Sequence, residues 1–146
     1  MSSSHLLSIA TFVFGLAAIF YLAALIFTKP RLTLPARWIV AAAVGITTVG
    51  ILLRWVESYQ MGIGHAPLSN LYESLVFFSW TAGVIYLFVE FKYKNAIIGA
   101  FVTPIAFLAM AYASMSPNIS DRIQPLVPAL KSNWLIAHVA TCFFGY

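Results

Sequence analysis

Residues 6–27 read LLSIATFVFGLAAIFYLAALIF, a run of 22 residues without a charged side chain. At about 1.5 Å per residue, a helix of this length crosses a hydrocarbon core of about 30 Å. A cleaved signal peptide would need Lys or Arg before the run and a small-residue cleavage site after it. Residues 1–5 contain neither Lys nor Arg, and Lys29 and Pro30 follow the run. We therefore predict a retained transmembrane helix.

Four further apolar runs follow, at residues 38–53, 71–91, 96–115 and 134–146. The run at 38–53 is short, but Arg37 and Arg54 at its ends can extend to the membrane interface. Its Ala41 and Gly45 are four residues apart and predict a close approach of another helix. The last run has 13 residues, whereas a span needs roughly 20. These runs predict an all-α polytopic membrane protein with four complete transmembrane helices and a truncated fifth, the N-terminal part of a longer protein.

The composition supports the same class. The 146 residues are 62% hydrophobic and 8% charged, whereas a soluble domain carries about 25% charged residues. Eight Lys and Arg residues are too few for a nucleic-acid surface, which needs clustered cations. We therefore expect the lipid bilayer, and no nucleic acid, as a partner.

The single cysteine, Cys142, lies inside an apolar run. One cysteine excludes an internal disulfide, a C-x-x-C redox pair and the C-x-x-C-H site of a c-type cytochrome. We predict that Cys142 is a small buried hydrophobic residue.

The cations in the links between the runs predict the orientation. The first link carries Lys29, Arg31 and Arg37, and the third carries Lys92 and Lys94, against three cations in the other two links. The positive-inside rule places the first and third links in the cytoplasm. We therefore predict that the N-terminus and the second and fourth links lie outside.

The second link leads into the third run through polar residues. Asn70 is a good N-cap for that helix, and Glu73 is placed to reach back to the Asn70 backbone in a capping box. An acid at the edge of the membrane is also a candidate for positioning a cation or a ligand. Glu57 and Glu90 lie at the ends of runs, where we expect solvated charges.

Near the start of the last run, Trp134 and His138 are four residues apart and share a helix face. A histidine in a span is costly unless it is used. A neutral imidazole is an iron ligand, and a hydrogen bond to a neighbouring helix is the alternative role. His65 in the second link and His5 at the terminus are expected to be solvated.

Two segments resemble a known family. Residues 64–75, GHAPLSNLYESL, and residues 128–139, PALKSNWLIAHV, are similar to the cytochrome c assembly domain of the CcsA/CcsB/ResC family of system II cytochrome c biogenesis proteins. The resemblance divides the chain into an N-terminal two-helix membrane segment, 1–61, and the start of the heme-handling domain, 62–146. It makes His65, Pro67, Asn70 and Glu73 candidate structural or functional residues.

The resemblance implies a membrane subunit that holds heme b at the outer face for covalent attachment to apocytochrome c, together with a ResB-type partner. His138 would be the first of two external axial ligands of the heme iron, and Trp134 would pack on the heme. The second external histidine and the tryptophan-rich WWD motif would lie beyond Tyr146. The part sequenced here supplies no catalytic residue and is expected to be inactive alone, although the whole would belong to a cytochrome c heme lyase or synthase complex.

Two other functions stay open at this point. One is a related heme-transport membrane protein that makes no c-type cytochromes, and the other is a transporter segment with no heme role. A b-type cytochrome is disfavoured, because His138 is the only histidine within a run. The expected location is a bacterial cytoplasmic membrane, with the thylakoid membrane as the alternative.

Overall fold

The computed structural model describes residues 3–64, 66–123, 125 and 133–145. These residues contain helices and no strand, which confirms the all-α prediction. The elements are α1 (Ser3–Ile26), the short 3-10 helix η1 (Pro30–Leu32), α2 (Thr33–Gln60), α3 (Leu71–Tyr93), α4 (Gly99–Met115) and α5 (Asn133–Gly145).

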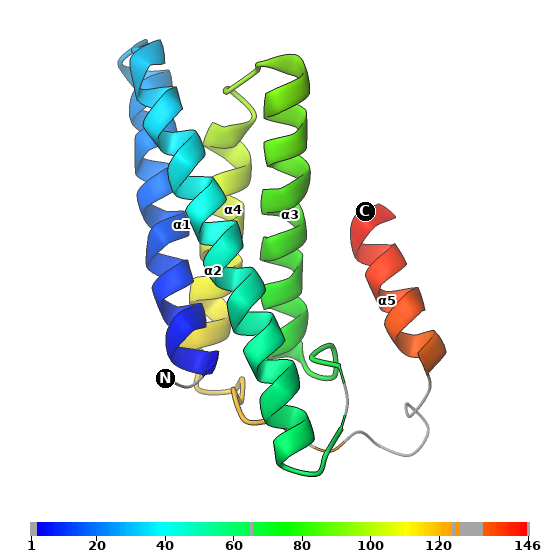
Figure 1. Cartoon of the computed structure of the whole chain (residues 1–146). Helices are drawn as coiled ribbons and strands as arrows, with labels where there is room; N and C mark the ends of the chain where they lie inside the picture. The colour runs from blue at the N-terminus through cyan, green and yellow to red at the C-terminus, as the bar shows by residue number, and fades with distance from the viewer. Residues whose placement is uncertain (1–2, 65, 124, 126–132, 146) are drawn as a thin grey trace.

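Helices α1 to α4 form an antiparallel four-helix bundle (Figure 1). Helix α1 packs against α2 and α4, and α3 packs against α4 and α2. Each helix reverses the direction of the one before it, as in an up-down-up-down bundle. Helix α5 stands beside α3 and contacts it. Residues 3–61 therefore share one packed bundle with α3 and α4.

Three stretches are long and apolar enough to cross a membrane: Ser3–Ile26, Pro30–Gln60 and Leu71–Tyr93. The chain is a multi-pass membrane protein. The predicted fourth span is shorter than expected, because α4 has 17 residues and begins at Gly99. Residues 96–98 form a turn instead, in which the Gly99 N–H donates to the Ala96 carbonyl at 3.1 Å. Seventeen residues is about the shortest length found for a transmembrane helix.

Small residues occupy many positions in the helix interfaces, and many large apolar residues face outward. Ala10 and Ala17 of α1, Ala43 of α2 and Ala106 of α4 are fully buried. Large side chains such as Phe12, which is 76% exposed, cover the outside of the bundle. This distribution is typical of helices that pack closely in lipid, since an exposed apolar side chain costs nothing there.

The close approach predicted at Ala41 and Gly45 is wrong. A Cβ atom added at Gly45 would meet no atom within 4 Å, and Gly45 is exposed. One of the crowded glycines is Gly83 of α3, where an added Cβ would lie 2.7 Å from Val44 Cγ2 of α2 and 3.3 Å from Phe14 Cζ of α1. Three helices therefore meet at Gly83 and not at Gly45.

Glu90 is not solvated, which corrects the sequence-based expectation. Its side chain is fully buried near the end of α3, and its Oε1 lies 3.2 Å from Arg37 Nε of α2. The Tyr21 hydroxyl of α1 donates to Glu90 Oε2 at 2.8 Å. A carboxylate buried in an apolar bundle requires such partners, so Glu90 joins three helices at this end. Glu57, at the opposite end, is half-buried and accepts from the Ser3 N–H at 3.0 Å.

The two cation-bearing links lie at the same end of the bundle, at the top of Figure 1. The N-terminal end of α1, the α2–α3 link and the chain after α4 lie at the other end. The grouping of the links therefore agrees with the topology predicted from their charges.

The glycine contacts predict a difference between two alanine variants in the helix interiors. Gly83→Ala should lower the stability in detergent by about 1 kcal/mol, because overpacking of about 1–3 kcal/mol exceeds the helix-propensity gain of up to about 1 kcal/mol. In Gly45→Ala the added Cβ meets no neighbouring atom, so only the gain in helix propensity applies. The melting temperature of this variant should therefore equal or exceed that of the parent. Thermal unfolding of the purified variants tests this; equal melting temperatures for the two would contradict the packing.

Candidate functional site

A buried ion pair joins α2 to α3 at the end of the bundle opposite Glu90. Arg54 Nε donates to Glu73 Oε1 at 2.9 Å, and the two side chains are only 3% and 1% exposed. The expectation that Arg54 extends to the interface is wrong. A guanidinium and a carboxylate can be buried together only when other hydrogen bonds satisfy their remaining atoms.

The α2–α3 link satisfies the carboxylate. Glu73 Oε2 accepts two hydrogen bonds of 2.7 Å, from the Ser69 N–H and from the Ser69 hydroxyl. The Asn70 side chain accepts from the Glu73 N–H at 2.8 Å, which confirms Asn70 as the N-cap of α3. Glu73 thus reaches back to the backbone of Ser69, one residue before the cap, instead of that of Asn70 as predicted. Because the Glu73 carboxylate lies between Arg54 and Ser69, it accepts from the Ser69 N–H and not from the backbone of Asn70.

The chain after α4 satisfies the arginine. Arg54 Nη2 donates to the Asp121 carbonyl at 2.7 Å, and the guanidinium lies over the Tyr72 ring, 5.0 Å from its centroid. An arginine in this position is held by a carboxylate, a carbonyl and an aromatic face. The pair therefore connects α2, α3, the α2–α3 link and the segment after α4.

The α2–α3 link turns through two glycines with positive φ, Gly62 at 74° and Gly64 at 60°. Left-handed backbone is strained for other residues, so these glycines allow the chain to reverse after α2. Pro67, which belongs to the link, is buried, and the next residue, Leu68, donates its N–H to the Ala66 carbonyl at 2.8 Å. Pro67 thus has a structural place here, whereas His65 lies outside the described residues.

The predicted heme ligand lies on α5. His138 is exposed, and its Nε2 lies 3.8 Å from Cys142 Sγ, one turn further along the same helix. Trp134, one turn earlier, is 82% exposed. Cys142 is half-buried, so the prediction of a buried residue is only partly correct. The imidazole thus makes no described hydrogen bond to a neighbouring helix, which was its alternative role.

Aromatic side chains hold the other half of α5 against α3. Phe143 packs edge-on against Phe77 with 5.4 Å between ring centroids, and Phe144 lies 6.1 Å from Trp80. The Trp80 indole N–H in turn donates to the Thr48 hydroxyl of α2 at 2.8 Å. Helix α5 is therefore anchored through its C-terminal turn, while Trp134 and His138 remain exposed.

The described residues bring together no group of three His, Cys, Asp or Glu side chains suited to a metal ion. No described hydrogen bond or ion pair joins His138 to Glu73 or Asn70. Sequence reasoning missed Arg54 as the partner of Glu73. The available signal was that an acid buried near the membrane edge needs a cation, and Arg54 is the nearest one before it in the sequence.

A family model described as cytochrome C assembly protein matches residues 68–146. The chain belongs to this family. The match contains Asn70, Glu73, Trp134 and His138 and begins after Arg54. A residue of the N-terminal helices therefore provides the counter-ion for an acid within the family segment. The predicted division of the chain at residues 61 and 62 stays a prediction.

Curated relatives are named cytochrome c biogenesis protein CcsA. The relative from Trieres chinensis is 45% identical over 94 residues, which are 64% of this chain and 28% of the relative. Those from Prochlorococcus marinus (strain NATL1A) and Chlorella vulgaris are each 40% identical, over 76% and 68% of this chain and 34% and 30% of the relative. The chain spans about a third of the length of these relatives. No solved structure matches the chain.

The buried pair predicts a large difference between the same substitution at two acids of this end of the bundle. Glu73→Gln should lower the stability of the protein in detergent by about 3–5 kcal/mol, because it leaves the Arg54 guanidinium buried without its counter-ion. Glu57→Gln, which keeps an oxygen for the Ser3 N–H, should cost about 1 kcal/mol or less. Thermal unfolding with matched protein and detergent concentrations measures both.

A Glu73→Gln variant as stable as the Glu57→Gln variant would show that Arg54 does not depend on the carboxylate. The double variant Arg54→Gln with Glu73→Gln gives a second readout. It should recover part of the loss, since no unpaired charge remains buried.

Proposed function

We propose that this chain is part of a cytochrome c biogenesis protein and provides the first heme-iron ligand, His138, at the outer face of the membrane. The observation that carries the proposal is the match of residues 68–146 to the cytochrome c assembly family, which includes His138. The names of the relatives support a role in cytochrome c biogenesis.

The surroundings of His138 suit an iron ligand. Its imidazole is exposed on α5, and its nearest described polar partner is the thiol of Cys142 at 3.8 Å. A thiol is a weak hydrogen-bonding group, so Nε2 is readily available to a metal. Trp134, one turn away and exposed, offers an indole on which the flat face of heme b packs. One imidazole leaves the sixth position of the iron for a ligand from outside this part of the chain.

The Arg54–Glu73 pair has a positioning role in this proposal. It fixes the α2–α3 link and the segment around Asp121 at one end of the bundle. The predicted topology makes this the outer end, where heme is the substrate that is joined to apocytochrome c. Supported loops keep the approach to the heme constant, which favours a defined geometry between heme and the cytochrome thiols. We further propose a ResB-type partner and a bacterial cytoplasmic or thylakoid membrane.

The His138 proposal predicts the effect of removing the imidazole. In the full-length protein, His138→Ala should lower the co-purified heme and the yield of c-type cytochromes about tenfold or more, the scale of loss when a metal site is disturbed. Soret absorbance of the purified protein and heme staining of cytochromes measure the two quantities. Added imidazole should restore part of both, because it replaces the missing ligand.

Cys142→Ala is the matched control, since it removes the neighbouring side chain and keeps the imidazole. It should retain heme and cytochrome yield. Unchanged Soret absorbance in His138→Ala would remove His138 from the site. A reduced amount of co-purified heme with an unchanged yield of c-type cytochromes would instead favour a heme-transport protein that makes no c-type cytochromes.

A further inference from the structure

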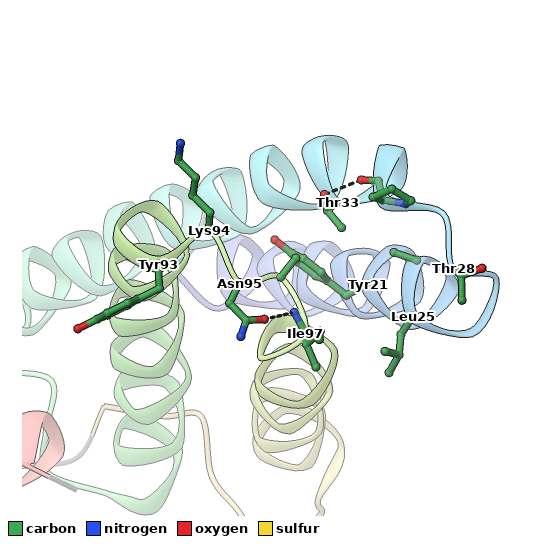
Figure 2. A pocket seen from close by; sticks show the side chains of 11 residues that line it. Tyr21, Leu25, Thr28, Thr33, Tyr93, Lys94, Asn95 and Ile97 are labelled. Carbon is green, nitrogen blue, oxygen red and sulfur yellow. Dashed lines mark hydrogen bonds between the residues drawn. The ribbon is translucent and has the colours of Figure 1, made fainter.

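The cation-rich end of the bundle contains a pocket of about 660 Å³. It lies between the end of α1, the α1–α2 link and the link from α3 to α4. Figure 2 shows Tyr21 at its centre, with Tyr93 and Lys94 on one side and Thr28 and Leu25 on the other. The lining is thus apolar toward α1 and polar around the rim.

The backbone at the rim is unusual. Thr28 and Lys94 both line the pocket, with φ of 51° and 52°, and they are the non-glycine residues with positive φ in the described part of the chain. Each follows the end of a helix, a position where glycine is the common choice. A β-branched residue such as Thr28 is a clear outlier there. Left-handed backbone thus shapes both sides of one opening.

Three cations lie at or beside the rim: Lys94 lines the pocket, and Lys29 and Arg31 adjoin the lining residues Thr28 and Pro30 in the sequence. Lys29 and Arg31 in the first link and Lys94 in the third are exposed. Neither of the two ion pairs among the described residues includes any of them. Glu90, the acid of this end, is already paired with Arg37 inside the bundle. The rim therefore has uncompensated positive charge suited to an anion.

A separate apolar groove of about 480 Å³ lies along the seam between α1 and α4, one turn of α1 away from the pocket. Leu25 lines the pocket and Leu22, three residues earlier on the same helix, lines the groove. Gly15, which has no side chain, and Ala18 also line the groove. From Leu22 to Phe12 the groove extends about 15 Å, at about 1.5 Å per residue. That is about half of a 30 Å hydrocarbon core, or one leaflet.

We propose that this seam binds one anionic glycerophospholipid, with its phosphate at the rim beside Lys29, Arg31 and Lys94 and an acyl chain in the groove. The combination of a cationic rim with an apolar groove one leaflet deep selects a ligand that has both an anion and a hydrocarbon chain. The proposal is independent of heme binding, because the seam lies at the end of the bundle opposite the Arg54–Glu73 pair.

Two other anions fit less well. A free phosphate would use the rim and leave the groove without an occupant. Heme carries carboxylates and apolar surface, but the described residues that line the pocket and the groove include no His, Cys or Met to bind its iron. A phospholipid uses both parts of the seam.

Native mass spectrometry of the full-length protein, titrated with phosphatidylglycerol and with phosphatidylcholine in detergent, tests the proposal. The first phosphatidylglycerol should bind more tightly than phosphatidylcholine. Lys94→Gln should weaken it about fivefold and Arg31→Gln with Lys94→Gln about 25-fold, since each cation near an anionic lipid contributes about 1 kcal/mol. Arg122→Gln, at the opposite end, is the matched control and should leave the affinity unchanged.

Three results would overturn the proposal. The first is equal affinity for the two lipids, or for the parent and the Arg31→Gln with Lys94→Gln variant. The second is competition by glycerol 3-phosphate at the same concentration as the lipid, which would show an ion site without a chain. The third is one-for-one displacement of phosphatidylglycerol by hemin, which would assign the seam to heme.

Discussion

The buried ion pair between Arg54 and Glu73 is the interaction on which the arrangement of one end of the bundle depends. Neither charge is stable alone in an apolar interior, and the pair is tolerated because Ser69 and the Asp121 carbonyl satisfy the remaining atoms. Two helices and two links meet at this pair. The pair thereby gives this end of the bundle a defined shape.

The two ends of the bundle use charge differently. At one end, Arg54 and Glu73 are both almost fully buried. At the other, Glu90 is buried but Arg37 is 25% exposed, and the exposed Lys29, Arg31 and Lys94 belong to neither described ion pair. Between the two ends, small residues at the interfaces and large residues outside are the arrangement expected in lipid. The difference gives the molecule a polarity along the membrane normal, with the proposed heme ligand and the proposed lipid rim at separate ends.

Much of the fold could be predicted from the sequence, because long uncharged runs leave few alternatives. The cores of α1 and α3 and the N-cap at Asn70 follow from local pattern and side-chain chemistry. The partners of Glu90 could not be predicted, since the Tyr21 that bonds it is 69 residues away along the chain. The sequence also could not predict that the close helix contact lies at Gly83 and not at Gly45. Hydropathy places a residue in a helix but does not indicate which neighbour its face meets.

For the candidate site, Glu73 was identified but its partner was not. A short segment of sequence contains the acid and its cap, whereas Arg54 approaches only when α2 and α3 pack. His138 was identified because its segment resembles a family, and residue type alone left two roles open. The structure shows that this imidazole is exposed and makes no described hydrogen bond to another helix. That exposure is a condition for binding a substrate.

The most direct test concerns the central claim that the end of the bundle held by Arg54 and Glu73 faces outward. In a Cys142→Ala background, Asp121→Cys and Asn95→Cys place single thiols at opposite ends of the bundle. A membrane-impermeant maleimide applied to intact cells should label position 121 directly and position 95 only after the membrane is permeabilised. Labelling of position 95 in intact cells, with position 121 protected, would contradict the account.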